Sequence, residues 1–435
     1  MNALFHLQEN HTTVGTEVRA GLTTFFAMAY IIFVNPVFLS VTGMDSDGAM
    51  IATCLGAAIG SILCALLSNK PFAMASGMGM NAFFAYTLCT GYGYTWQQAL
   101  GLVFLAGLLF LLAAAALGDR VATLIPENLR HAITAGIGLL IALIGLVDGG
   151  LIDFSSGVPA LADLHSPTVL VAVIGLIVTI ALTVKGIGGS LILGMIFTVI
   201  LSLALGQTAL PDTAVMAPTA LSKVFLKLSF TGLLPAGEGL RGVISLLALI
   251  LTMTIVDMFD TVGYLVGTAS RADLMDEDGH MHGMKRVMLA DAGATVLGAL
   301  CGTSTVTVYA ESTSGIVAGG RTGLTALTTA LCFLAATFLS PIAGMMSAAV
   351  TAPALIVVGM YLLMDIRSIH LDSMTDAIPA LLTVIAIPMT YSITSGIGIG
   401  FLSYVLCSLC AGRRKELQAG SVGLAVIFLL YFVMS

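Results

Sequence analysis

Charged residues are scarce in this chain. Only 9% of its 435 residues are Asp, Glu, Lys or Arg, whereas 58% are apolar; soluble globular domains carry about 25% charged residues and less than half apolar ones. This deficit is too large for a soluble body with one membrane anchor, so it excludes that class of protein. The formal net charge of −7 is spread over short connections, which predicts no nucleic-acid partner.

Signals for chemistry that needs a bound group are also missing. No Gly-x-x-x-x-Gly-Lys-Ser/Thr sequence occurs, so the chain is not expected to use ATP itself. The polar stretch 273–282 holds acids and histidines, but it has neither calcium-loop nor zinc-site spacing. Cys407 and Cys410 match a redox spacing but lie in an apolar run, where small packing residues are the better interpretation. No metal and no organic cofactor is therefore predicted.

Long apolar runs fill most of the chain. Runs of about 17–25 residues recur from Gly21 almost to the end, and each is long enough to cross roughly 30 Å of hydrocarbon as a helix. They do not alternate between apolar and polar residues, as the strands of a membrane barrel do. The sequence predicts an all-α polytopic membrane protein with fourteen spans, near residues 20–41, 48–68, 72–90, 96–117, 129–148, 167–184, 189–206, 243–266, 286–302, 306–319, 322–342, 346–364, 376–391 and 395–411. A further apolar segment, 421–434, is either a short extra span or an interfacial helix.

The positions of Lys and Arg predict the orientation, because these residues collect on the cytoplasmic side of short loops. With the N-terminus in the cytoplasm, only Lys223, Lys227 and Arg241 fall outside, all within the longest connection. The inside receives Arg19, Lys70, Arg120, Arg130, Lys185, Arg271, Lys285, Arg286, Arg321, Arg367, Arg413, Arg414 and Lys415. We expect a multi-pass protein of the cell inner (plasma) membrane, with both ends of the fourteen-span region in the cytoplasm.

Two sets of seven spans resemble each other. The third span holds Asn81 within the Gly-containing stretch 75–84, and the tenth holds Glu311 within 302–315, which is rich in Gly, Ser and Thr. Since seven is odd, two such halves must be inverted relative to each other, and Gly-interrupted spans at matching positions of inverted repeats indicate a binding site at mid-depth. Small residues also permit close helix packing, but packing alone does not explain polar residues at equivalent points of both halves.

Four acids lie inside predicted spans. Asp257 and Asp260 are in the eighth, Asp291 is in the ninth and Glu311 is in the tenth. A carboxylate at the centre of a membrane helix costs about 2.5–3.5 kcal/mol on insertion scales, and no Lys or Arg lies in the middle of any span. We therefore expect the acids to face a wet or ligand-filled cavity, or to stay protonated, and to mark a substrate or proton pathway.

The spacing of these acids suggests separate roles. Asp257 and Asp260 are three residues apart and share a helix face, and two close carboxyls in a poorly solvated site do not both ionise easily. Proton coupling is therefore predicted at Asp260, Glu311 or Asp257. A plain hydrogen bond to a neighbouring helix explains Asp257 equally well, and Asp291 is a candidate supporting brace.

The tenth span also predicts how a flat ligand is held. Residues 303–309 are β-branched and hydroxyl-rich, which suits a short extended strand, and residues 311–314 then open a half-helix with free amides. Carboxylates accept from ring N–H groups, while backbone amides donate to ring nitrogens and carbonyl oxygens. The predicted substrate-binding residues are Asn81, Asp260, Glu311, Asp257, Met80, Phe83 and Ser312. In this set Phe83 is the stacking ring, and the amides near Met80 and Ser312 complete the clamp.

Several motifs together give the chain a specific family resemblance. They are residues 25–36, 77–84, 259–261, 302–305, 311–315, 320–325 and 351–355, and they run through most of the chain. In these segments the sequence resembles the azaguanine-type (AzgA-like) purine permeases of the nucleobase:cation symporter-2 group. Two positions depart from that pattern: Ser76 stands where Pro is common, and Tyr264 stands where Thr is common. They put the shape of the broken third span and the substrate range in doubt.

The resemblance implies the uracil-transporter fold, with seven plus seven inverted spans and short strands in spans 3 and 10. A core domain (20–117 and 243–342) would move against a gate domain (129–206 and 346–411) in an elevator-like way, with 421–434 outside both. It also implies proton-coupled uptake of adenine, hypoxanthine or guanine, with functional positions at Asn81, Asp257 or Asp260, and Glu311.

The hypothesis is therefore a purine–proton symporter and not an enzyme. An anion exchanger or channel on the same fold is the main alternative, and it would need a cationic residue at the mid-depth site, where the sequence offers only acids. A membrane-embedded enzyme would need a nucleophile–base pair or a metal cluster, and no intramembrane His is present. The preferred purine, the acid that titrates and the formation of a homodimer stay open.

Overall fold

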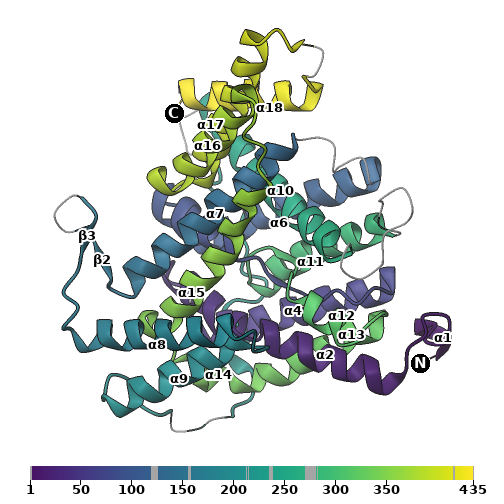
Figure 1. The fold of residues 1–435 in the computed structure, drawn as a ribbon, viewed down its shortest axis with the longest axis vertical. Coiled ribbons are helices and arrows are strands. Elements are labelled where there is room, and N and C mark those ends of the chain that lie inside the picture. The colour runs from purple at the N-terminus through teal and green to yellow at the C-terminus, as the bar shows by residue number, and fades with distance from the viewer. Residues whose placement is uncertain are drawn as a thin grey trace.

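The computed structural model describes residues 2–118, 126–154, 158–211, 213, 215–234, 239–269, 281, 283–414 and 417–434. Its main helices are α2 (Val14–Met28), α3 (Ile31–Ser40), α4 (Ser46–Ser68), α5 (Met78–Ala82), α6 (Trp96–Leu117), α7 (Glu127–Asp148), α8 (Pro167–Val184), α9 (Ser190–Ala204), α10 (Gly239–Ala269), α11 (Met284–Cys301), α12 (Ser312–Val317), α13 (Gly323–Ala336), α15 (Ala348–Leu363), α16 (Met374–Thr390), α17 (Ile393–Cys410) and α18 (Ala419–Met434). Shorter elements are α1 (Asn2–Phe5), α14 (Ser340–Ala343), the π-helix η1 (Phe83–Gly91) and the 3₁₀ turns η3 (Thr219–Lys223), η4 (Thr337–Leu339) and η5 (Met364–Ser368). Figure 1 shows their arrangement.

Nine helical segments of the described chain are long and apolar enough to cross a membrane. They are Val14–Ser40, Ser46–Ser68, Trp96–Ala116, Glu127–Asp148, Pro167–Val184, Gly239–Leu265, Gly323–Ile342, Ala348–Ser368 and Ile393–Cys410. Each coincides with one of the fourteen predicted spans. The protein is thus a multi-pass helical membrane protein.

The other five predicted spans have physical reasons to differ from a plain apolar helix. Spans 3 and 10 are interrupted by strands, while α9 and α16 in spans 7 and 13 have only 15 and 17 residues. Helix α11 in span 9 carries three charged residues, Lys285, Arg286 and Asp291. The total of fourteen stays a prediction.

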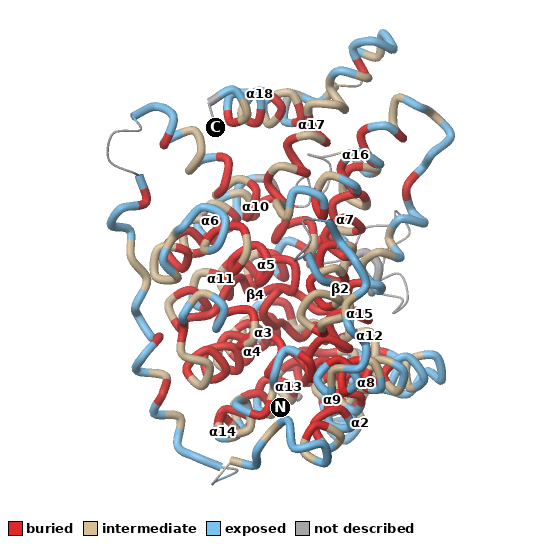
Figure 2. Tube along the Cα trace, turned by 90° about the vertical axis from the view of Figure 1, so that its left-hand side faces the viewer, coloured by how far each residue is buried: buried red, intermediate tan, exposed pale blue. Residues whose placement is uncertain are grey.

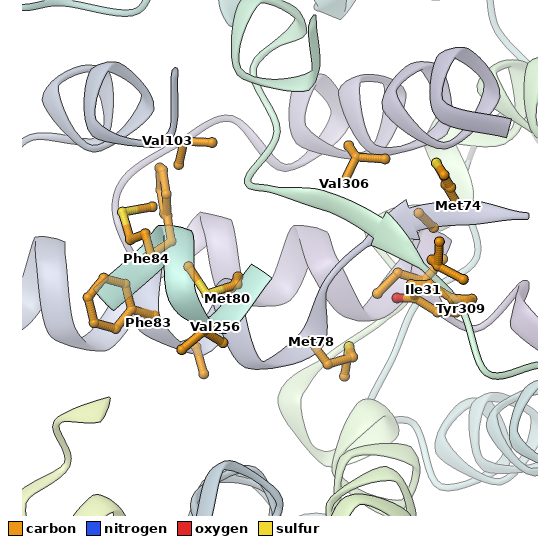
Figure 3. Packing of buried hydrophobic residues seen from close by; sticks show 14 of the residues in the cluster. Ile31, Met74, Met78, Met80, Phe83, Phe84, Val103, Val256, Val306 and Tyr309 are labelled. Atoms are coloured by element: carbon orange, nitrogen blue, oxygen red, sulfur yellow. The ribbon is translucent and has the colours of Figure 1, made fainter. Parts of the chain in front are cut away.

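Two short strands pair at the centre of the molecule, and this β1–β4 pair is called the strand crossing below. β1 (Met74–Ser76) pairs antiparallel with β4 (Val306–Val308), with Ala75 opposite Thr307, and Figure 3 shows the two strands side by side. The pairing satisfies backbone groups that lipid could not. It confirms the strands expected in spans 3 and 10, although β4 is shorter than the predicted 303–309.

A half-helix follows each strand. Asn81 is the fourth residue of α5, whereas Glu311 immediately precedes α12. The two side chains are therefore offset by about one helical turn. The prediction that they occupy equivalent points of the two halves is wrong. Figure 2 shows that α3, α4, α5 and β4 lie in the most buried part of the molecule.

The helices pack in two sets. In one, α4 packs against α11 and α13, and α6 packs against α10 and α11; in the other, α7 packs against α15 and α16, and α8 against α9. The first set belongs to the predicted core domain and the second to the predicted gate domain. That these sets move as bodies stays a prediction. A second small hairpin, β2 (Ile152–Asp153) with β3 (Ala160–Leu161), projects from the end of α7 (Figure 1).

Span 1 is broken in its middle. Pro36 has no amide hydrogen and its ring crowds the carbonyl four residues earlier, so a kink is expected near residue 32. In the structure α2 ends at Met28 and α3 begins at Ile31. Tyr30 lies in the break and its side chain is fully buried.

The segment 421–434 forms most of α18. The Phe428 ring stacks on Phe401 of α17, with 6.2 Å between ring centroids, and Phe432 lies against Gly398. These contacts pack α18 against α17 at one end of the molecule (Figure 1). Tyr431 is hydrogen-bonded to Tyr92, just beyond η1, so the segment is an integral helix of the molecule.

Candidate substrate site

Glu311 lies where the tenth span is broken. Its side chain is half-buried, and its Oε1 accepts a hydrogen bond of 2.8 Å from the Tyr30 hydroxyl. No ion pair among the described residues involves Glu311. The carboxyl therefore keeps acceptor capacity that the protein does not use.

Two further tyrosines lie in the neighbourhood of this carboxyl. Besides Tyr30, both Tyr264 and Tyr309 are close enough for the Glu311 charge to act on their hydroxyls, and the Asp260 charge also acts on Tyr264. The Tyr309 hydroxyl donates to the carbonyl of Ser76, which joins β4 to β1. Tyr264, which stands where Thr is common in the resembled permeases, thus lies near Asp260 and Glu311, two of the three acids that were predicted to bind substrate.

Asn81 holds the strand crossing together. Its Oδ1 accepts hydrogen bonds from the Ser76 hydroxyl, at 2.7 Å, and from Ser304. Ser304 belongs to the other half of the chain, so Asn81 is a tie between the two broken spans. The Ser76 hydroxyl, at the position where Pro is common in the family, supplies half of this tie.

The remaining members of the predicted clamp also make their contacts within the protein. The Ser312 hydroxyl accepts from the Ala73 amide at 3.0 Å, and the Ser312 amide donates to the Tyr309 carbonyl at 3.1 Å. Met80 and Phe83 are 1% and 0% exposed and pack among apolar side chains (Figure 3). As placed here, Phe83 is a packing residue of the hydrophobic core.

Asp291 supports β4. Its Oδ2 accepts from the Val308 amide at 3.0 Å, from the Thr307 hydroxyl at 3.2 Å and from Thr261 of α10. Three donors on one oxygen fix the strand to α11 and α10. This geometry agrees with the role of a supporting brace.

Asp257 is tied to a neighbouring helix. Its Oδ2 accepts from the Thr295 hydroxyl of α11 at 2.9 Å, and the Val306 amide in turn donates to Thr295 at 3.1 Å. Its Oδ1 is buried without a hydrogen-bond partner among the described residues. Of the two roles left open for Asp257, the helix-to-helix bond is the one that this conformation displays.

Asp260 faces open space instead. It lines a cavity of about 150 Å³ together with Arg130, His131, Thr134, Phe259, Gly263, Tyr264, Tyr361, Leu362 and Asp365. The cavity lies between α10 on one side and α7, α15 and η5 on the other, so residues of both predicted domains line it. A larger cavity of about 380 Å³, at the end of η1, contains none of the predicted site residues.

Sequence reasoning missed the gate side of this cavity. Arg130, which entered only as a marker of topology, is the fourth residue of α7, and its guanidinium carbon is 5.9 Å from the centre of the Phe259 ring. His131 pairs with Asp365, with 3.0 Å between Nδ1 and Oδ2. A cation inside the first turn of a predicted span was the available signal, and its distance from the acids could not be read from the chain alone.

The site combines acceptors, phenols and a cation without metal-type ligation. Among the described residues no group of three or more His, Cys, Asp or Glu side chains could hold a metal ion. Two broken spans meet at the centre, one of them carrying Glu311, and the unbroken α10 places Asp260 at a cavity. Interrupted spans of this kind form the binding sites of many secondary transporters.

Comparison with known proteins gives the family. A model described as "Permease family" matches residues 15–399, and the chain belongs to this family. It is 37% identical to the guanine/hypoxanthine permease PbuO of Bacillus subtilis, over 98% of this chain and 99% of that protein. It is also 37% identical to the adenine permease AdeP of Escherichia coli, over 100% of this chain and 96% of that protein. The chain is thus a permease and not an enzyme.

Solved structures show the same fold at low sequence identity. The transmembrane domain of the cyanobacterial bicarbonate transporter BicA superposes with a TM-score of 0.65 at 16% identity, covering 88% of this chain and 97% of that one. The inward-facing murine anion transporter Slc26a9 gives a TM-score of 0.66 at 10% identity, covering 93% and 69%. At these identities the likeness concerns the fold alone.

Proposed function

We propose that this permease imports a purine base (adenine, hypoxanthine or guanine) together with a proton across the cell inner membrane. Relatives named as guanine/hypoxanthine and adenine permeases, 37% identical over nearly their whole length, support this substrate class. Three of the motifs that carry the family resemblance, 77–84, 302–305 and 311–315, lie in the two broken spans.

The observation that carries the proposal is the environment of Glu311. The carboxyl lies where the tenth span is interrupted, between β4 and α12. It accepts from one phenolic hydroxyl, has no cationic partner among the described residues and is only partly buried. Ring N–H groups of a purine are suitable partners for its free acceptor positions. Tyr264, whose hydroxyl lies in the electrostatic field of the same carboxyl, is the nearby phenol that lines the adjoining cavity.

The proton would bind at Asp260 or Glu311, the two predicted acids that are only half-buried. A proton that moves down about 100 mV supplies roughly 2.3 kcal/mol, enough for some fiftyfold accumulation. In the proposed cycle the core domain carries base and proton past the gate domain. Asp257, Asn81 and Asp291 hold the strand crossing rigid while it moves.

Anion transport is the competing function, because the structural neighbours carry anions. It would place a cation at the strand crossing. Arg130 lines the Asp260 cavity from the α7 side, and it is not among the described residues that bond to the crossing. The geometry therefore favours a neutral base with N–H groups.

The test is uptake of radiolabelled adenine, hypoxanthine and guanine by cells that lack their own purine permeases. We expect concentrative uptake that collapses with a protonophore, and at least about a tenfold loss for Glu311→Gln, since a hydrogen bond to a charged group is worth roughly 1.5–3 kcal/mol. Glu9→Gln, on the exposed N-terminal segment, is the matched control. Uptake indifferent to the proton gradient refutes the coupling, and no uptake of any purine refutes the substrate class.

A further inference from the structure

The larger cavity of the described structure plays no part in the site above. Its volume is about 380 Å³, within the roughly 300–1,000 Å³ that is usual for small-molecule sites. It lies between the last turns of η1, the junction of α16 and α17, and the end of α18. The first of these segments belongs to the predicted core domain and the second to the predicted gate domain. Segments distant in the chain thus enclose a space large enough for a small ligand.

Phenol rings and small hydroxyls make up nearly all of its lining. Of the ten described lining residues, five are serine or threonine and four are tyrosine, namely Tyr86, Tyr92, Tyr391 and Tyr431. No charged residue is among these ten, and the Asp148 charge acts on the Tyr86 and Tyr391 hydroxyls from nearby. An anion would lose its hydration there without gaining an opposite charge. A neutral flat ring with polar edges fits this lining, because it stacks on phenols and its N–H groups and ring nitrogens bond with hydroxyls.

The cavity has an exposed rim and a buried floor. Tyr92 at the rim is 38% exposed, whereas Tyr431 and Thr87 are 5% and 3% exposed. The hydroxyls of Tyr92 and Tyr431 are hydrogen-bonded to each other, so rim and floor are joined where α17 and α18 form one end of the molecule (Figure 1). A small molecule can therefore approach the floor from the rim.

The floor contains a hydroxyl without a partner. Thr87 lines the cavity, and its Oγ1 is buried with no hydrogen-bond partner among the described residues. Thr90, in the same helix, instead donates to the Ala85 carbonyl at 3.0 Å. A buried polar atom without a partner is destabilising, and a ligand that bonds to it removes that cost. The helix that carries Thr87, η1, is a π-helix of nine residues, a rare form that occurs frequently at functional sites.

Tyr391 keeps a ring at the cavity against the preference of its backbone. Its φ is +50°, in the left-handed region that glycine and asparagine tolerate better than tyrosine does. Strained positions of this kind cluster at binding sites. The ring meets Phe154 edge to face, with 6.4 Å between ring centroids, so it is held in place beside the cavity.

We propose that this cavity is a second binding site for the transported purine, separate from Glu311 and Asp260. The inference rests on the proposed function, because it takes the purine as the ligand. In this site the base stacks on the tyrosine rings and forms a hydrogen bond with the Thr87 hydroxyl. Since η1 continues directly from α5, the second site and the strand crossing lie at different ends of one broken span.

The test counts the purines that the purified full-length protein binds. Equilibrium dialysis with labelled adenine, hypoxanthine and guanine gives the number of sites and their dissociation constants. For a transported base we expect two sites per chain in the wild type. Glu311→Gln should weaken one of them, and changes at the cavity should weaken the other.

Two variants address the cavity. Thr87→Val exchanges the hydroxyl for a methyl group, so the affinity of the second site should fall roughly fivefold, as for one neutral hydrogen bond. Because that hydroxyl has no partner in the protein, the Tm in detergent should stay unchanged or rise. Tyr391→Asn removes the ring and tolerates the left-handed backbone, and it should weaken the same site at least about tenfold, since stacking of a base on an aromatic ring is worth this much.

Thr252→Val is the matched control. It also removes a buried hydroxyl without a partner in the described structure, but Thr252 belongs to α10 and is not among the residues that line either cavity. Both dissociation constants should equal those of the wild type. A change as large as that of Thr87→Val would overturn the inference, because the effect would then not depend on the cavity.

The other failing outcomes are distinct. A single class of site, weakened by Glu311→Gln and unaffected by Thr87→Val and Tyr391→Asn, overturns this inference and leaves the proposed function standing. Competition by ribose as effective as that by unlabelled purine would mark an unselective polar recess and would also overturn it. If the wild-type protein binds none of the three purines, the proposed function itself fails, and this inference fails with it.

Discussion

At the scale of single residues, the polar groups of the membrane interior divide by what they contact. Asn81, Asp257 and Asp291 bond to the strands or to the helices that hold them. Glu311 accepts one side-chain hydrogen bond, from Tyr30, and Asp260 lines a cavity that a ligand or a proton could use. Insertion cost identified the four acids from the sequence, and the likeness of the two halves identified Asn81. Neither argument could separate braces from binding groups, since that depends on donors from distant segments.

The first prediction concerns the side-chain donor to Glu311, the Tyr30 hydroxyl. Tyr30→Phe removes the hydroxyl at 2.8 Å from Oε1 and keeps the ring. We expect about a tenfold higher KM for purine uptake with a smaller change in maximal rate, because the carboxyl loses its orientation. Tyr94→Phe, which removes a hydrogen bond of 3.1 Å to the Leu233 carbonyl, should leave KM unchanged. Equal KM values for both variants and the wild type would contradict the assignment of Glu311 as the binding carboxyl.

At the scale of elements, the strand crossing depends on glycines of α4. A Cβ at Gly60 would lie 2.8 Å from Val306 Cγ1 and 3.0 Å from Met74 Cβ, so both strands lie against this glycine. A Cβ at Gly56, one turn earlier, would lie 3.1 Å from Val306 Cγ2. The β-branched run after residue 302 predicted a strand. The glycine face of α4 against which the strand packs could not be predicted, because it depends on tertiary contacts between distant segments.

Gly60→Ala should therefore destabilise the protein although alanine is the better helix former. Overpacking a filled interior costs about 1–3 kcal/mol, more than the roughly 1 kcal/mol gained in helix propensity. Gly293→Ala in α11, where the nearest atom would be Leu63 Cδ1 at 3.7 Å, should be neutral or stabilising. Thermal unfolding in detergent, followed by the fluorescence of the single tryptophan, Trp96, compares the two. A lower Tm for Gly293→Ala than for Gly60→Ala would refute this packing.

At the scale of the whole molecule, composition and span length were enough to predict a multi-pass helical protein. They were not enough to give the packing partners, because an apolar run has no preference among apolar neighbours. Arg130 illustrates the limit: its place in the chain marks a span end, while its place in the fold, beside Phe259, makes it part of a cavity. The division into two moving domains stays a prediction, and it has a direct test.

A disulfide between the domains should stop transport if they slide past each other. A Cβ at Gly79 of α5 would lie 3.9 Å from the Ile137 Cβ of α7, inside the roughly 3.5–4.5 Å typical of disulfides. In a chain whose native cysteines have been replaced, we expect oxidised Gly79→Cys/Ile137→Cys to lose purine uptake and to regain it on reduction.

The control pair lies within the predicted gate domain. A Cβ at Gly400 of α17 would be 3.4 Å from the Thr383 Cβ of α16, close to the lower end of the same range. Gly400→Cys/Thr383→Cys should therefore also cross-link and keep its uptake. Each single variant supplies the baseline rate. Because α5 belongs to the strand crossing and α7 carries Arg130, an elevator movement must change the distance between them. Uptake that persists through the oxidised Gly79–Ile137 bond would mean that these helices travel together, and the two-domain cycle would then have to be abandoned.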